Sequence, residues 1–301
     1  MTTRPPNHVY VVIAAAILAI SAAGVLVRGA EGASPVTIAL YRSAGVALLF
    51  SPFWVRPSRA DAWRIGVAGV ALAAHFTAWF ASLEHTTVLR STVLVTFTPL
   101  WVGLMEWGFF RSAPRWRFWP GILVGALGTA TMVSDGGTGT LYGDGLAVLG
   151  GLLAAVYLIT GRSVRSRMGI GPYAASVCAV SAACLLPVAV FSGTALAGFS
   201  TPTWLAIAGL TLGPQLIGHN GLNYALGWFD ASTISALTLL EPIGATLLAA
   251  AVLGEIPAAW TGVGAVMALV GVAIAVGPSV RGQRRQGRGP AVPVHVDEDG
   301  P

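Results

Sequence analysis

A carboxylate and a proline stand side by side in the apolar segment TLLEPIGATLLAAAVLGE, residues 238–255. Pro242 has no backbone N–H and disturbs the preceding turn of a helix, so it frees a backbone carbonyl inside this segment. Glu241 can take a proton or hold a cationic group, and we expect it to occupy the opening that the proline makes. The alternative is a neutral glutamate that hydrogen-bonds to a neighbouring helix.

Gln215, His219 and Asn223 follow one another at four-residue spacing in a second apolar segment. This spacing puts them on one face of a helix, which predicts a polar cavity lining in which His219 can hydrogen-bond Glu241. The alternative is hydrogen bonding between helices that only holds them together.

His75 and Trp79 lie one helical turn apart in a third apolar segment. Trp79 can stack on an aromatic or cationic solute, and His75 can face the same cavity. A structural histidine and a packing tryptophan are the alternatives.

Arg42 and Glu106 are further charges within apolar segments. We expect them to form a gate or an ion pair. The alternatives are an Arg42 that binds an anion, an Arg42 head group that extends to the outer membrane face and a Glu106 that only packs.

The chain holds no pattern typical of enzymes or cofactor sites. HExxH, GxSxG and metal-ligand spacings are absent from the sequence, and no glycine-rich phosphate loop precedes a lysine. We therefore expect no catalytic residue, no metal, no cofactor and no enzyme activity. Cys178 and Cys184 match no metal or disulfide pattern.

Composition places these residues in a lipid bilayer. The chain has 301 residues, of which 55% are hydrophobic and 10% charged, whereas a soluble domain has about 25% charged residues. A bilayer-spanning helix needs about 20 apolar residues. Ten spans are expected: 9–27, 36–55, 65–83, 88–110, 118–134, 145–161, 173–192, 203–225, 231–253 and 258–277.

The arginines indicate an orientation. All 17 basic residues are arginine, and 14 of them fall in alternate connections if the N-terminus is cytoplasmic. They are spread between the apolar segments, which does not favour a nucleic-acid partner. We expect a multi-pass protein of the cell membrane, inner or plasma, with both termini cytoplasmic.

Two parts of the sequence repeat each other. At an offset of 143, residues 99–128 match 242–271 in Pro99/Pro242, Pro114/Pro257, Gly121/Gly264 and Gly128/Gly271, and residues 75–81 match 219–225 with a shift of one. Two halves of five spans each must point in opposite directions, an arrangement that recurs in secondary transporters. Gly121, Gly125 and Gly128 with Gly264 and Gly271 also permit close helix approach, either as a homodimer face or, as we favour, within the chain.

The segments TPLWVGLME (98–106) and GHNGLNYALGWFDASTISALTLLEPIGATLLAAAVLGE (218–255) resemble the EamA-type transporters of the drug/metabolite transporter (DMT) superfamily, over residues 9–277. The resemblance implies an all-α integral membrane protein whose ten transmembrane helices form two inverted five-helix repeats. Helices 1–4 and 6–9 would line a central pathway. Ser112 departs from the family, which often has glutamate there.

The expected organisation is a cytoplasmic N-terminus (1–8), a first repeat (9–134), an extracytoplasmic linker (135–144), a second repeat (145–277) and a disordered cytoplasmic tail (278–301). We expect a secondary transporter of a small organic solute, such as an amino acid, a metabolite or a drug-like compound, acting as an exporter with protons as coupling ion. A passive facilitator, an intramembrane enzyme and a non-transporting scaffold are the alternatives.

Overall fold

The computed structural model describes residues 5–109, 114–132, 139–253 and 259–277. Ser112, Glu255 and the tail at 278–301 lie outside these ranges. Every regular element in the described ranges is helical. The α-helices are α1 (Asn7–Ser21), α2 (Ala23–Gly29), α3 (Pro35–Phe50), α4 (Arg59–His85), α5 (Val88–Val95), α6 (Thr98–Gly108), α7 (Phe118–Thr131), α8 (Leu141–Arg165), α9 (Ile170–Phe191), α10 (Thr201–Leu210), α11 (Asn220–Ala225), α12 (Ala231–Leu237), α13 (Glu241–Leu253) and α14 (Ala259–Val276).

Seven helical stretches of the described chain are long and apolar enough to cross a membrane. They are Asn7–Gly29, Pro35–Phe53, Arg59–His85, Val88–Gly108, Leu141–Arg165, Ile170–Phe191 and Ala231–Val252. The other three expected spans correspond to α7, to the interrupted α10–α11 stretch and to α14. The all-helical membrane fold is therefore confirmed, and seven of the ten expected spans meet the length of a crossing.

Local sequence sets where several helices begin. In each case a serine or threonine accepts a hydrogen bond from the backbone N–H three residues later, which caps the first helical turn. The pairs are Ser34 and Thr37, Ser58 and Asp61, Thr87 and Arg90, Thr140 and Gly143, and Ser200 and Thr203.

Two helices are interrupted directly before a proline. The chain turns at 96–97 between α5 and α6, and a 3-10 turn, Thr238–Leu240, separates α12 from α13. The carbonyl four residues before Pro99 accepts a hydrogen bond of 2.8 Å from the Thr98 hydroxyl. The equivalent carbonyl before Pro242 accepts from the backbone N–H of Glu241. At each break another donor therefore supplies the hydrogen bond that the proline, which has no N–H, cannot give to this carbonyl.

Two more helices are irregular at their middles. Ala22 separates α1 from α2, and a π-helical segment, Thr211–His219, lies between α10 and α11. Wide turns of this kind are frequent at functional sites, and interrupted helices mark the binding sites of many transporters.

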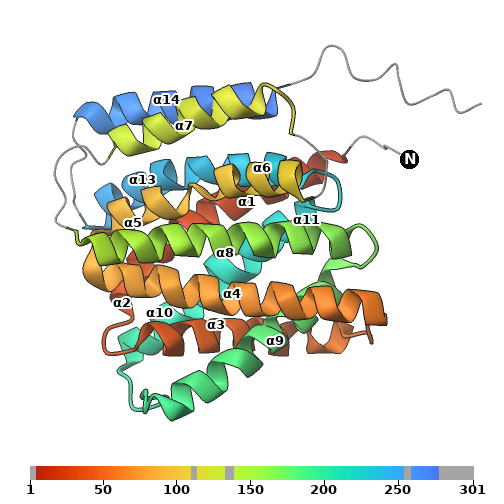
Figure 1. Cartoon of the computed structure of the whole chain (residues 1–301). Helices are drawn as coiled ribbons and strands as arrows, with labels where there is room; N and C mark the ends of the chain where they lie inside the picture. Colours follow the sequence, from red (N-terminus) through yellow and green to blue (C-terminus); the bar gives the residue numbers. More distant parts are fainter. Residues whose placement is uncertain (1–4, 110–113, 133–138, 254–258, 278–301) are drawn as a thin grey trace, which may run out of the picture.

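Helices α7 and α14 lie side by side at one edge of the bundle (Figure 1). A Cβ at Gly121 would lie 2.7 Å from the Gly271 carbonyl oxygen, and a Cβ at Gly128 would lie 2.7 Å from the Gly264 carbonyl oxygen. Contacts that run in opposite directions along the two helices make them antiparallel. The glycine faces are thus buried against each other within the chain, as favoured over a dimer face.

The remaining helices interleave the two halves of the chain. Helix α4 packs on α8, and α3 packs on α9. Helix α1 packs on the π-helical segment and on α11, while α2 packs on α10. Each pair takes one member from either half, so the halves form one bundle, whose layers are seen in Figure 1.

Candidate functional site

The interrupted helices surround a central cavity of about 50 Å³. Its walls include the breaks before Pro99 and Pro242 and parts of α1, α4, α8 and the π-helical segment. Apolar side chains such as Ile20, Leu158 and Leu222 supply much of the lining. Its polar lining consists of His75, Thr96, Thr98, Tyr157, His219, Thr238 and Glu241.

Residues from equivalent positions of the two halves face this cavity together. Thr98 and Glu241 correspond at the offset of 143, and each precedes its proline. His75 and His219 also correspond, and their ring centroids are 6.0 Å apart. Two pairs of corresponding residues thus face one cavity, and of the two breaks only the second places a carboxylate there.

Glu241 is the first residue of α13 and lies directly after the 3-10 turn. Its backbone carbonyl accepts a hydrogen bond of 3.2 Å from the Ser21 hydroxyl at the end of α1. Within the described ranges its carboxylate has no hydrogen-bond or ion-pair partner, and it lines the cavity. Glu241 thus faces the cavity directly beside the break before Pro242.

His75 is fixed by a hydrogen bond from its Nδ1–H to the Gly150 carbonyl, at 2.8 Å. A neutral ring held in this way presents Nε2 as an acceptor. The indole of Trp79 stacks on His75 with a centroid distance of 6.3 Å and an interplanar angle of 6°. In the described part of the chain the buried Trp79 Nε1 has no hydrogen-bond partner.

Gln215 and Asn223 do not line the cavity with His219, and that expectation was wrong. Both are fully buried behind the lining. Gln215 accepts a hydrogen bond of 2.8 Å from Arg42 Nε, whereas Asn223 Nδ2 donates to the Tyr157 hydroxyl and, at 2.7 Å, to the His219 carbonyl. The π-helical segment changes the helical register here, so three residues at four-residue spacing no longer share one direction.

Arg42 forms no ion pair with Glu106, and its head group does not extend out of the protein. The side chain is fully buried, and its Cζ lies 4.1 Å from the Phe76 ring centroid. The expected ion pair with Glu106 and the outward-extending head group were therefore both wrong, because α3 is turned so that residue 42 faces inward.

Glu106 borders a second cavity of about 300 Å³ at the end of α6. Ser232, Asp230 and Arg115 contribute to the same lining. Helix α6 reaches both cavities, because Thr98 at its start lines the central cavity and Glu106 near its end borders the second one. Glu106 is thus placed at a cavity mouth, without Arg42 as its partner.

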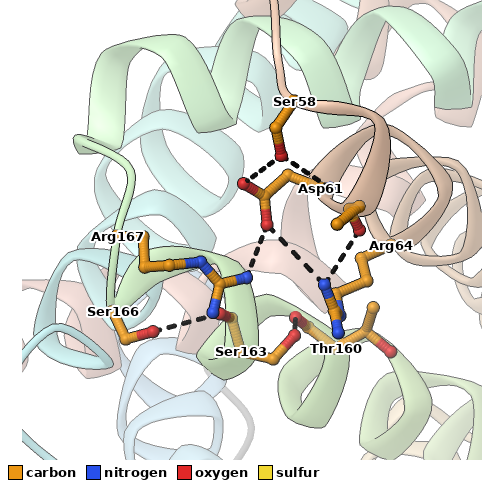
Figure 2. A network of polar contacts seen from close by, with 8 residues as sticks. Ser58, Asp61, Arg64, Thr160, Ser163, Ser166 and Arg167 are labelled. Atoms are coloured by element: carbon orange, nitrogen blue, oxygen red, sulfur yellow. Dashed lines mark hydrogen bonds and ion pairs between the residues drawn. The ribbon is translucent and has the colours of Figure 1, made fainter.

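A polar network ties the start of α4 to the segment that follows α8, at this same end of the bundle (Figure 2). Asp61 accepts a hydrogen bond of 2.9 Å from the Ser58 hydroxyl and pairs with Arg167 at 2.5 Å. Arg64 lies 3.8 Å from the same carboxylate. At the opposite end Arg90 binds Asp144 with two hydrogen bonds, of 2.8 and 2.6 Å.

Sequence reasoning missed several cavity residues. Thr98 was detectable, because the repeat aligns it with Glu241. Tyr157 carried no such indication, since a single tyrosine in an apolar helix is ordinary, and only packing turns it toward the cavity.

Comparison with known proteins gives consistent results. The EamA-like transporter family matches residues 8–134 and again residues 141–277, which correspond to the two halves. An uncharacterized transporter of Archaeoglobus fulgidus is 27% identical over 263 residues, covering 81% of this chain and 88% of that protein. The uncharacterized transporter YwfM of Bacillus subtilis is 24% identical over 251 residues, covering 79% and 83%.

A solved crystal structure shares the fold, with a TM-score of 0.75 at 18% identity, covering 90% of this chain and 97% of that one. The apolar helices and the relatives together make this a multi-pass membrane protein of a transporter family rather than an enzyme family. The paired family matches coincide with the two interleaved halves that meet at the central cavity. The chain belongs to the EamA-like transporter family.

Proposed function

We propose that the protein is a secondary transporter of a small organic solute that works by alternating access around the central cavity. The observation that carries this proposal is the meeting of Thr98 and Glu241, from equivalent helix breaks, in one cavity. A site shared by two equivalent halves can be exposed to either side of the membrane when the halves exchange their arrangements.

The two halves are inverted repeats in this proposal, and the ten expected spans all cross the membrane. The antiparallel packing of α7 and α14 supports it. Gly121 corresponds to Gly264 and Gly128 to Gly271, so the contact of Gly121 with Gly271 becomes the contact of Gly128 with Gly264 when the halves are exchanged. Only an approximate twofold axis in the membrane plane relates antiparallel equivalent helices in this way.

The end of the bundle with the polar network faces the cytoplasm of a cell membrane. Arg64, Arg115, Arg162 and Arg167 gather near this end, and the cavity that Arg115 borders also includes Val276, at the end of α14. Tyr10, near the start of α1, contacts Phe229 beside the same cavity. Both termini are then cytoplasmic, in agreement with the positive-inside rule.

The cavity bordered by Glu106 is the cytoplasmic mouth of the pathway. Helices α6 and α12 lead from it to the central cavity, and their equivalents are α13 and α5, which also contact each other. Alternating access would open the α5–α13 side while the α6–α12 side closes. Net export of an amino acid, a metabolite or a drug-like compound is the expected direction.

Glu241 couples transport to protons in this scheme. Its carboxylate is held beside the cavity without a partner in the described chain, where it can exchange a proton for a group of the solute. Passive facilitation of the same solutes is the alternative, and it needs no titratable group.

The proposal is tested by a solute screen with purified protein in liposomes under an imposed proton gradient. We expect the wild type and the surface variant Glu84→Gln to accumulate a solute against its gradient, since Glu84 is exposed outside the cavity. Glu241→Gln should exchange labelled for unlabelled solute without net accumulation. Accumulation by Glu241→Gln would show that another group couples transport to protons. Exchange without accumulation by the wild type would indicate passive facilitation, and transport by no variant would refute the proposal.

A further inference from the structure

Arg42 places a full positive charge in the interior of the bundle. Its side chain has 0% exposure in the middle of α3. An arginine at the centre of a membrane helix costs about 2.5–3.5 kcal/mol on insertion scales. Such a residue is therefore expected to act on a site nearby.

The immediate surroundings of Arg42 hold it but do not neutralise it. Nε donates to Gln215 at 2.8 Å, and the guanidinium packs on the ring of Phe76. Its two terminal nitrogens have no hydrogen-bond partner in the described chain, and no carboxylate forms an ion pair with it there. The charge is fixed in position by neutral groups alone.

A single aromatic ring separates this charge from the cavity lining. The Phe76 ring, which lies under the guanidinium, contacts the His219 ring edge-on at a centroid distance of 5.1 Å. His219 lines the cavity. The Glu241 carboxylate lines the same cavity, so the guanidinium lies one ring away from a wall of the cavity that also contains this carboxylate.

We propose that Arg42 is a fixed counter-charge to Glu241 that sets the charge selectivity of the cavity, so that neutral and zwitterionic solutes are accepted in preference to organic cations. The proposal deepens the proposed transport function and rests on it. With both side chains ionised, Arg42 and Glu241 leave the cavity without net charge. An organic cation then meets the carboxylate and the guanidinium together, and its attraction to the first is offset by repulsion from the second.

The expected effect is large enough to measure. Two unit charges about 8 Å apart at an effective dielectric constant of about 20 change an equilibrium about 30-fold. The guanidinium does not contact the solute and acts on it only through its electrostatic field, so the effect depends on the charge of residue 42 and not on its shape. Arg42→Lys should keep the selectivity, whereas Arg42→Gln should lose it.

The test reads the cavity charge without needing the solute. Thr238→Cys places a thiol in the cavity lining, in a background with Cys178→Ser and Cys184→Ser. Labelling rates are compared for methanethiosulfonates that carry a trimethylammonium group, a sulfonate group or only a methyl group. The methyl reagent normalises access, and Arg59→Gln, at an exposed arginine outside the cavity, is the matched control.

Arg42→Gln should raise the ratio of trimethylammonium to sulfonate labelling by about tenfold or more. Glu241→Gln should lower this ratio, and Arg42→Lys and Arg59→Gln should leave it near the starting value. Substitutions at residues 42 and 241 are expected to change the labelling ratio in opposite directions. If Arg42→Gln does not fold, the ratio in Glu241→Gln and in Arg42→Lys still tests the inference. An unchanged ratio, or exclusion of both charged reagents from every variant, would overturn the inference.

A second measurement links the charge to solute choice. Competition in the liposome assay compares alanine with ethylamine, and valine with isobutylamine, which differ by the carboxylate. Wild type should favour the zwitterion of each pair, and Arg42→Gln should shift the preference toward the amine. Failure of transport in wild type concerns the proposed function, whereas the labelling ratio remains a measure of the Arg42 inference.

Discussion

Thr98 and Glu241 face the same cavity from equivalent positions, each directly before a proline that interrupts its helix. At the first break the Thr98 hydroxyl satisfies the carbonyl that Pro99 leaves free. At the second break a backbone N–H does so, which leaves the Glu241 side chain available to the cavity. The two halves thus place equivalent breaks at one cavity but satisfy the freed carbonyl differently, and only the second break adds a titratable group.

This equivalence predicts that the carboxylate can be moved. Glu241→Thr alone should abolish proton-driven accumulation in liposomes, because the cavity then has no carboxylate. Adding Thr98→Glu should restore part of it, since the new carboxylate enters the same cavity from the equivalent break. A folded double variant with no more accumulation than Glu241→Thr would contradict the functional equivalence of the positions.

Close packing of α7 on α14 predicts a stability loss for Gly271→Val. A side chain at residue 271 would meet the backbone of Gly125, and such overpacking costs about 1–3 kcal/mol. The thermal unfolding temperature of the purified protein in detergent should fall. Gly262→Ala, on the same helix with open space around it, is the matched control and should not lower that temperature.

The network in Figure 2 predicts a small coupling energy between Asp61 and Arg167. The Arg167 side chain is 53% exposed, and exposed ion pairs contribute about 0.2–1 kcal/mol. A double-mutant cycle of Asp61→Asn and Arg167→Gln should give a value in this range, and the value should shrink at high salt. A coupling of several kcal/mol would mean that the pair controls more than local packing.

Inversion of the two halves predicts opposite labelling of equivalent positions. Arg117 and Trp260 correspond at the offset of 143, and both are exposed near the starts of α7 and α14. In cells, a membrane-impermeant thiol reagent should label Trp260→Cys from outside and should reach Arg117→Cys only after the membrane is opened. Labelling of both residues from the same side would refute the inverted arrangement.

The sequence by itself determined that the chain lies in a lipid bilayer, where most of its helices are and where two of them are interrupted. Apolar runs identify the spans because about 20 apolar residues are needed to cross the hydrocarbon core. These runs are helical because the core offers no hydrogen-bond partners, so each segment must pair its own backbone groups. Ser58, Thr140 and similar caps mark helix starts through contacts only three residues apart. Pro99 and Pro242 interrupt their helices for reasons contained in the proline ring, and so their effect could be predicted without knowing the fold.

Tertiary structure decided which side chains meet. The π-helical segment turns Gln215 toward Arg42 and His219 toward the cavity. Their four-residue spacing in a regular helix would have placed both side chains on the same face. Arg42 is buried because α3 packs against α4 and α9, and Tyr157 reaches the cavity because α8 packs against α4. These outcomes depend on the rotation of one helix against another, which is set by contacts between residues far apart in the chain.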